Sequence, residues 1–279
     1  MSTSQNASSL SQFTETIVLV GLGKMGSALL EGWVDLGLDP RRVVVFEPQP
    51  SARIIHLVTR GVRLNPDHAN VGPAAVVVVA VKPQVAPDVV PGLKSLVGSG
   101  TVVVSIMAGR TLHFLETALP DTAIVRSMPN TPAAIGRGIT VAVPNARVNP
   151  SQRELAEDLL AATGAVEWVD DEGLLDAVTA VSGSGPAYVF LLAESLARAG
   201  AAAGLPPDLS ERLARATVAG SGELMQRSPL DAAALRENVT SPGGTTAAAL
   251  AVLMAPHGLD ALLEKAVAAA TKRSQELAG

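Results

Sequence analysis

The stretch TIVLVGLGKMGSALLEGW (residues 16–33) joins an apolar β-branched run to a glycine-rich turn and then to a helical pattern. A short continuous run such as TIVLVG is typical of a strand buried on both faces of a parallel sheet. After the turn, Leu29, Leu30 and Trp33 recur with the spacing of one helix face. The stretch therefore predicts a strand, a tight turn and an amphipathic helix, which open an α/β fold.

The turn contains Gly21, Gly23 and Gly26 in the spacing G-x-G-x-x-G. In a dinucleotide-binding turn the first glycine permits the sharp bend, the second lets backbone approach a pyrophosphate, and the third allows close packing of the helix. The pyrophosphate would then lie at the helix N-terminus, where unpaired N–H groups point outward. This spacing alone is a weak signal, but its place between a buried strand and a helix predicts a dinucleotide site.

Glu47 bears on the choice of dinucleotide. It ends the next predicted strand, residues 42–47, and follows Gly26 by 21 residues. A carboxylate there would accept hydrogen bonds from the ribose hydroxyls of NAD and repel the extra phosphate of NADP. Arg53 follows closely and could offset that repulsion by pairing with the phosphate. The choice between NADH and NADPH stays open.

The remainder of the first half alternates strands and helices. Strands separated by helices of about ten residues predict βαβ units and a mostly parallel sheet. We therefore expect a Rossmann-type domain over residues 15–170. Its further predicted strands are 74–81, 101–108, 122–130, 138–144 and 165–169, and its helices are 52–61, 85–97, 111–119 and 151–164.

From residue 171 onward the patterns predict helices alone, and we expect an all-α domain over residues 171–279. The segment 186–203 is apolar on most faces. A long helix that is apolar all round must be buried against another element. In a small helical domain we expect that element to belong to a second subunit, which predicts a homodimer.

Two stretches in the helical half combine hydroxyls and glycines ahead of a helix. NVTSPGGTTAAAL (238–250) holds Ser241, Gly243, Gly244, Thr245 and Thr246, and VSGSGP (181–186) has a similar make-up. Bare amides at a helix N-terminus bind a carboxylate or phosphate without Arg or Lys. Simple helix capping is the alternative for both stretches. With a dinucleotide domain beside them, they favour hydride transfer to a small acid.

The composition limits the classes of function. The chain has 279 residues, is 48% hydrophobic and carries a net charge of −5, so we expect a globular protein with no nucleic-acid partner. It has no cysteine, and its four histidines show no metal-ligand spacing, so no metal site is expected. The apolar run 74–81 is too short to span a bilayer, and residues 1–14 are expected to form a mobile tail without a signal sequence. These features predict a cytoplasmic protein without a membrane partner.

Four stretches closely resemble pyrroline-5-carboxylate reductase, the last enzyme of proline biosynthesis. They are AVTAVSGSGPAYVFLLAESL, NVTSPGGTTAAAL, AVKP (80–83) and MPNTPAAIGRGIT (128–140). The resemblance implies reduction of the cyclic imine of 1-pyrroline-5-carboxylate to L-proline by NADPH or NADH. It also implies a helical domain that intertwines with its twin, and dimers that often assemble into decamers. The chain departs from the family at Met107, where a small residue is usual, and at FEPQPSAR (46–53).

The resemblance also implies roles for individual residues. Gly243, Gly244 and Thr245 would hold the substrate carboxylate through backbone amides, Ser241 would help to close the pocket, and Thr246 would bond the ring nitrogen as the catalytic residue. The implied cofactor contacts follow the strands of the first domain. They are Gly21, Leu22, Gly23, Lys24, Met25, Gly26, Glu47, Asn70, Ala80, Val81, Lys82, Pro83, Ala108, Gly109, Met128, Pro129 and Asn130.

Two other functions stay open at this point. A related two-domain β-hydroxy-acid dehydrogenase would need a lysine placed for proton transfer, and Lys265 and Lys272 both lie beyond the SPGGTT motif on the last predicted helix. A dinucleotide-binding redox sensor without turnover would need no substrate pocket, which the intact SPGGTT motif disfavours.

Overall fold

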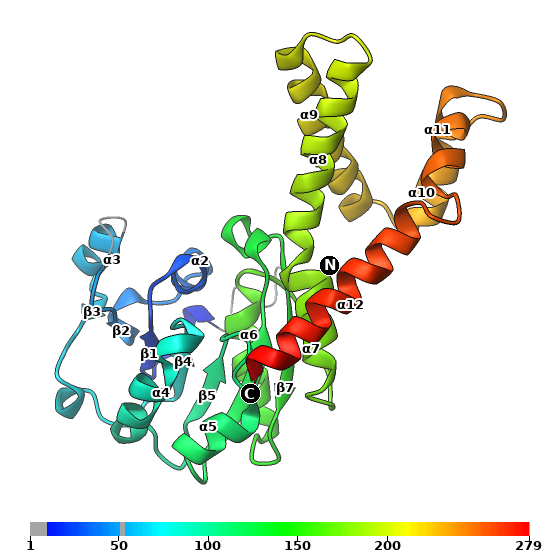
Figure 1. The fold of residues 1–279 in the computed structure, drawn as a ribbon. Coiled ribbons are helices and arrows are strands. Elements are labelled where there is room, and N and C mark those ends of the chain that lie inside the picture. Colours follow the sequence, from blue (N-terminus) through cyan, green and yellow to red (C-terminus); the bar gives the residue numbers. More distant parts are fainter. Residues whose placement is uncertain (1–9, 51–53, 279) are drawn as a thin grey trace. The chain divides into compact units, whose positions relative to one another are not determined.

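The structure of the protein is a computed structural model that describes residues 10–50 and 54–278 (Figure 1). It forms two compact units. The sheet unit comprises residues 1–183 and 271–279, and the helical unit comprises residues 184–270. The segment after the last strand and the end of the last helix thus belong to the sheet unit. The domain boundary near residue 170 stays a prediction.

The sheet unit is built on an 8-stranded sheet with the order β3-β2-β1-β4-β5-β6-β7-β8. Neighbouring strands are parallel except for β6 and β7. The link between β6 and β7 contains no crossover helix, so β7 returns antiparallel. The strands are β1 (Ile17–Val20), β2 (Val43–Phe46), β3 (Arg63–Leu64), β4 (Val76–Val79), β5 (Val102–Ser105), β6 (Ala123–Met128), β7 (Gly138–Pro144) and β8 (Gly164–Trp168).

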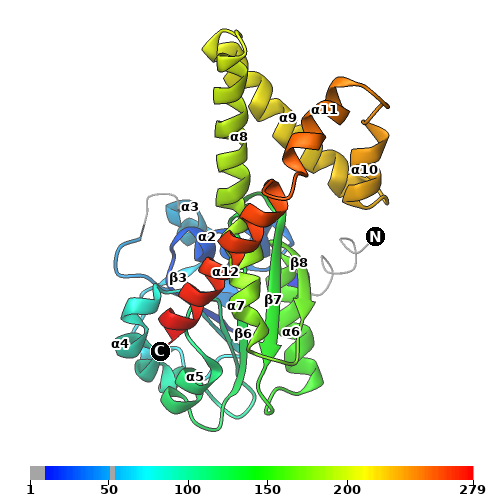
Figure 2. The ribbon, with the colours of Figure 1, turned by 45° about the vertical axis from the view of Figure 1, so that its right-hand side comes forward.

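Helices cover both faces of this sheet (Figures 1 and 2). One face packs against α2, α3 and α6, and the other packs against α4, the 3-10 segment η5 and α5. Alternate residues of each central strand enter the two cores, so that Leu19 joins one core and Val18 the other. Burial on both faces explains the uninterrupted valine runs, and the predicted α/β class is confirmed. The helices are α2 (Lys24–Asp35), α3 (Ile55–Thr59), α4 (Ala86–Val89), α5 (Leu112–Ala118), α6 (Pro150–Ala161) and α7 (Leu174–Val178).

Local structure differs from the sequence prediction at several places, and one is the short strand β3, which no predicted strand covers. The helix expected over 85–97 is the short helix α4 followed by η5 (Val90–Leu96). Pro91 lacks the N–H that would continue α4, whereas Pro87 lies in the first turn of α4, where Pro is tolerated. The tail expected over 1–14 is wrong at its end, since Leu10 is 1% exposed in the core and Phe13 packs against that core. The part of the predicted tail over residues 1–9 lies outside the described residues.

The helical unit consists of helices and their connections over residues 184–270, as predicted. Its main pair is α8 and α9, which pack together where Ser210 Oγ of α9 donates to the carbonyl oxygen of Ala197 at 2.7 Å. The helices are α8 (Gly185–Ala202), α9 (Pro207–Arg227), α10 (Ala232–Asn238), α11 (Thr245–Leu253) and α12 (Leu259–Ala278), whose last turns belong to the sheet unit.

Helix α8 exposes its apolar side chains in the single chain. None of its residues, all of which the structure describes, is buried. Phe190 is 64% exposed, and Val189, Leu191, Leu192 and Leu196 are also exposed. An apolar patch of this kind on a protein marks an interaction surface.

The stretch Leu174–Ala202, which runs from α7 through α8, has the length and composition of a membrane span. It is the one candidate among the described residues, with a mean hydropathy of 1.3. A long helix in the interior of a soluble protein satisfies the same criterion, so a single candidate is weak support for a span.

Candidate functional site

The parallel strands of the sheet unit end at one edge, and the predicted cofactor residues follow those ends. Residues 21–26 follow β1, Glu47 follows β2, residues 80–83 follow β4, residues 108–109 lie beyond β5, and residues 128–130 end β6. In open α/β sheets ligands bind outside the carboxyl ends of the strands. The fold therefore gathers segments that are far apart in the sequence at one edge.

The glycine turn after β1 has the geometry of a pyrophosphate cradle. Gly21 has a φ of +95°, and a Cβ there would lie 2.7 Å from the carbonyl oxygen of Ala80. A Cβ on Gly26 would collide with the carbonyl oxygen of Gly21. A Cβ on Gly23 would meet no atom of the described chain within 4 Å, and Gly23 begins α2 without a side-chain cap. The space and the amides that a pyrophosphate needs are thus both present.

Glu47 is tied to this turn by its carboxylate. Oε2 accepts from the N–H of Leu22 at 2.7 Å, and Oε1 accepts from the N–H of Gln49 at 2.9 Å. The Asn65 side chain holds the Glu47 backbone from both sides, accepting from its N–H and donating to its carbonyl, each at 2.8 Å. A carboxylate oxygen has two lone pairs, so both oxygens can also accept a ribose hydroxyl.

Asn70 lies near the end of β2. It is exposed in the turn η3 (His68–Asn70), and the ring of His68 packs 4.3 Å from that of Phe46, the last residue of β2. The turn that holds Asn70 therefore packs against the last residue of β2. Arg53, the alternative influence on cofactor choice, lies outside the described residues.

Arg110 connects two loops of the predicted site, and the sequence reasoning missed it. Its Nε donates to the carbonyl oxygen of Pro83 at 2.9 Å, and its guanidinium lies 4.9 Å from the ring centre of Phe114. The segment Ala80–Pro83 after β4 is thereby joined to the loop after β5, which turns at Gly109 with a φ of +68°.

The residues at the end of β6 contact the second hydroxyl-glycine stretch. Asn130 is buried, and its Oδ1 accepts from the N–H of Ile139 at 3.0 Å. A Cβ on Gly183 would lie 2.5 Å from Cε of Met128. Gly183 ends a π-helical turn, Thr179–Gly183, and such turns occur frequently at functional sites. Ser182 donates to the carbonyl oxygen of Val178 at 3.1 Å, and the N-cap of α8, Ser184, makes no side-chain capping hydrogen bond within the described residues.

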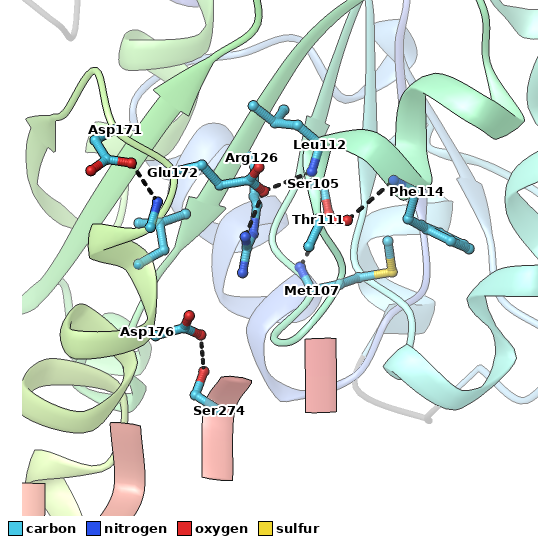
Figure 3. A network of polar contacts seen from close by, with 12 residues as sticks. Ser105, Met107, Thr111, Leu112, Phe114, Arg126, Asp171, Glu172, Asp176 and Ser274 are labelled. Atoms are coloured by element: carbon cyan, nitrogen blue, oxygen red, sulfur yellow. Dashed lines mark hydrogen bonds and ion pairs between the residues drawn. The ribbon is translucent and has the colours of Figure 1, made fainter. Parts of the chain in front are cut away.

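A polar network joins β6, the start of α5 and the segment before α7 (Figure 3). Arg126 of β6 donates through Nη1 to Oε1 of Glu172 at 2.6 Å, and the same oxygen accepts from the N–H of Leu112 at 2.7 Å. Nearby, Ser274 near the end of α12 donates to Asp176 of α7 at 2.6 Å. Neither Arg126 nor Glu172 was among the predicted site residues. The signal was present as a charged residue inside the apolar strand AIVRSM.

The predicted substrate residues lie in the helical unit: Ser241, Gly243 and Gly244 on the loop before α11, and Thr245 and Thr246 in its first turn. Gly243 has a φ of +69°, and the N–H of Gly244 donates to the carbonyl oxygen of Ser241 at 3.0 Å. Gly244 is the N-cap of α11, and no side-chain hydrogen bond from the described residues caps this helix. The capping alternative for Thr245 and Thr246 is therefore not what the structure has, and the first amides of α11 are available to an anion.

The fold and the sheet edge define a two-unit oxidoreductase with a dinucleotide site. Residues 16–109 match the family model described as NADP oxidoreductase, coenzyme F420-dependent, and residues 172–277 match that of pyrroline-5-carboxylate reductase dimerisation. The pyrroline-5-carboxylate reductase of Synechocystis sp. is 43% identical over 265 residues, which cover 93% of this chain and 97% of that protein. That of Pseudomonas aeruginosa is 39% identical, over 95% of this chain and 97% of its own length.

Solved structures of pyrroline carboxylate reductases are also similar to this chain. A pyrroline-5-carboxylate reductase from Coxiella burnetii has a TM-score of 0.88 and 35% identity, over 96% of this chain and 100% of that chain. The Plasmodium falciparum pyrroline carboxylate reductase with NADP bound has a TM-score of 0.79 and 30% identity, over 95% of this chain and 99% of that chain. The chain belongs to the pyrroline-5-carboxylate reductase family. The resemblance seen in the sequence is confirmed, whereas the roles of the individual site residues stay predictions.

The open space at Gly23 allows a substitution that changes cofactor binding without disturbing the fold. We expect Gly23→Ala to keep the wild-type unfolding temperature, because the new methyl group meets no protein atom. We expect it to weaken NADH and NADPH binding about tenfold or more, which corresponds to ~1.4 kcal/mol, because the methyl group takes the space of the pyrophosphate. Fluorescence titration of the reduced cofactor measures this change. Gly92→Ala, at an equally open position in η5, is the control. Unchanged affinity in Gly23→Ala would contradict the cradle.

Proposed function

We propose that the protein reduces 1-pyrroline-5-carboxylate to L-proline, the last step of proline biosynthesis, with NADH or NADPH as the hydride donor. The observation that carries the proposal is the similarity to pyrroline-5-carboxylate reductases along nearly the whole chain. This similarity favours the imine over the β-hydroxy-acid substrate and over a sensor without turnover.

The proposed reaction needs little general acid–base catalysis from the protein. The bound dinucleotide supplies a hydride to the ring carbon of the C=N bond, and the ring nitrogen carries a proton in the product amine. A cyclic imine is readily protonated, and the resulting iminium accepts hydride without a strong general acid. The work of the protein is then to orient the imine carbon toward the cofactor and to keep it there.

The substrate would bind on the loop before α11. The amides of Gly243, Gly244 and Thr245 would hold its carboxylate, supported by the left-handed backbone of Gly243 and by the uncapped start of α11. The hydroxyl of Thr246 would bond the ring nitrogen, and Ser241 would help to close the pocket. The cofactor would lie along the sheet edge from Glu47 to Asn130, with its pyrophosphate on residues 21–26.

The protein would act as a homodimer in the cytoplasm, with dimers able to assemble into decamers. The proposal rests on the exposed apolar face of α8 and on the match of residues 172–277 to a dimerisation family. A dimer interface also accounts for the hydropathy of Leu174–Ala202 without a membrane.

The direct test follows the loss of reduced-nicotinamide absorbance with racemic 1-pyrroline-5-carboxylate, with NADH and NADPH in parallel. We expect turnover with at least one cofactor. A folded protein that oxidises neither cofactor in the presence of the imine would overturn the proposed substrate, and hydroxy acids would then be assayed.

Removal of the Thr246 hydroxyl tests its catalytic role. We expect Thr246→Val to lower turnover more than about tenfold, equivalent to ~1.4 kcal/mol of transition-state stabilisation, with cofactor affinity and folding retained. Steady-state kinetics and cofactor titration measure the two effects. Thr217→Val, at an exposed position on α9, serves as the control. Wild-type kinetics in Thr246→Val would remove the hydroxyl from the mechanism.

Glu47 is expected to set the cofactor preference. In Glu47→Gln the amide oxygen can still accept from Leu22, but the negative charge that repels a ribose phosphate is lost. We expect the ratio of kcat/KM for NADPH to that for NADH to rise about tenfold, or ~1.4 kcal/mol. Glu154→Gln, an exposed change on α6, should leave the ratio unchanged. A ratio that does not move in Glu47→Gln would point to residues outside the described part of the chain.

A charge on α8 tests the dimer. Phe190 is 64% exposed in the single chain, so Phe190→Glu should be tolerated by the fold but should bury a charge in an interface. We expect light scattering to give a smaller assembly for Phe190→Glu than for the wild type. Ile55→Glu is matched, because Ile55 is 61% exposed on α3 and lies outside the dimerisation match. The same assembly size in all three proteins would exclude α8 from the interface.

A further inference from the structure

Arg126 is an unusual residue for the interior of a sheet. It lies in the apolar strand β6 and is 5% exposed, and among the described residues it is the one charged side chain in the buried class. Burial of a charge is costly, so a buried guanidinium needs a partner and is seldom kept for stability alone.

The partner of Arg126 is one carboxylate oxygen of Glu172, which also accepts a second hydrogen bond. Oε1 of Glu172 accepts from Nη1 of Arg126 at 2.6 Å and from the N–H of Leu112 at 2.7 Å (Figure 3). Leu112 is the first residue of α5, where the helix dipole favours an anion. The charge of Glu172 is therefore shared between a strand and a helix start that are not neighbours in the sequence.

Strand β6 and the loop before α5, which Glu172 connects, both carry predicted nicotinamide contacts. Arg126 precedes Met128 by two residues, so the two side chains stand on the same face of β6. Leu112 directly follows the loop that contains Ala108 and Gly109. The Glu172 carboxylate thus fixes the ends of the two segments between which the nicotinamide and its ribose would lie.

The loop after β5 also has hydrogen bonds to other elements. Its link to β6 is the charged contact of Glu172 with Leu112 and Arg126. Arg110 joins the loop to Pro83 at 2.9 Å, and the N–H of Met107 donates to Ser105 Oγ at 3.3 Å. These bonds act on the side of β4 and β5. Strand β6 is also tied to the end of β5, where Ser127 Oγ donates to the carbonyl oxygen of Ser105 at 3.0 Å. The shared carboxylate adds the tie between β6 and the far end of the loop, at Leu112.

We propose that Glu172 and Arg126 are positioning residues for the nicotinamide half of the cofactor. They touch neither substrate nor cofactor, and they hold the loop after β5 at a fixed distance from Met128. The proposal rests on the proposed function for the identity of the cofactor, and it predicts a defect confined to the nicotinamide half. The adenosine half binds at β1 and β2, which the pair does not contact.

Two variants test the pair. Glu172→Gln keeps an acceptor for Leu112 and removes the charge that binds Arg126. The double variant Arg126→Met with Glu172→Gln also removes the buried cation, so that no unpaired charge is left to unfold the protein. Asp171→Asn is the matched control, since Asp171 lies in the same turn, is exposed, and its carboxylate accepts from the N–H of Gly173 at 2.8 Å.

Binding of whole and half cofactors is the measurement. Calorimetric titration compares NADH with ADP, and NADPH with 2′,5′-ADP. We expect both Glu172 variants to weaken reduced-cofactor binding about fivefold or more, or ~1 kcal/mol, and to bind the adenosine half-cofactors within twofold of the wild type. The Asp171→Asn control should match the wild type for all four ligands.

Other results overturn the proposal. Unchanged binding of the reduced cofactors in the variants removes any positioning role. Equal weakening of whole and half cofactors, or failure of both variants to fold, assigns the pair to overall stability. If the wild type binds NADH or NADPH but does not reduce the imine, the proposed substrate fails while the ratio of whole to half cofactor binding still decides the role of the pair.

Discussion

The closeness of β1, the turn after it and β4 is the constraint on which the rest of the site depends. Gly21 bends with a φ of +95° directly against the carbonyl oxygen of Ala80, and Gly26 packs against the carbonyl oxygen of Gly21. Any side chain at these positions would force α2 away from the sheet. Because none is present, the N-terminus of α2 comes to the edge where the parallel strands end, and its free amides face the space in which a dinucleotide can bind.

Charged side chains around this edge bond backbone groups of the loops. Glu47 holds the N–H of Leu22, Arg110 holds the carbonyl of Pro83, and Glu172 holds the N–H of Leu112. Each bond ties one strand-end loop to another element, and charge-assisted bonds are the stronger kind. The loops of the site are therefore arranged before any ligand arrives, which suits a reaction whose main requirement is orientation.

Two features stand out in the described part of the helical unit, an exposed apolar helix face and a helix start without a side-chain cap. Helix α8 exposes Phe190 and Leu191 in the single chain, and an exposed apolar face of this kind marks an interaction surface. The loop before α11 stands at a helix start with no side-chain cap from the described residues. Both features lie within residues 172–277, which match the dimerisation family.

The sequence by itself determined the α/β class, every strand except β3, the glycine turn and the family. These follow from local patterns: β-branched runs for strands buried on both faces, helical spacing in Leu29, Leu30 and Trp33, and glycines where a Cβ would collide. The sequence could not show that Leu10 is buried, that the chain turns from α4 into the 3-10 segment η5 at Pro91, or that Glu47 bonds Leu22.

Only the tertiary structure decided the partner of Arg126, 46 residues away at Glu172, and the contact between Gly183 and Met128. Such pairs depend on which strand ends the sheet order brings together, and no local pattern records a distance across a sheet. The physical reason is that propensity and periodicity act over a few neighbouring residues, whereas the geometry of the site is set by packing between elements that are distant in the chain.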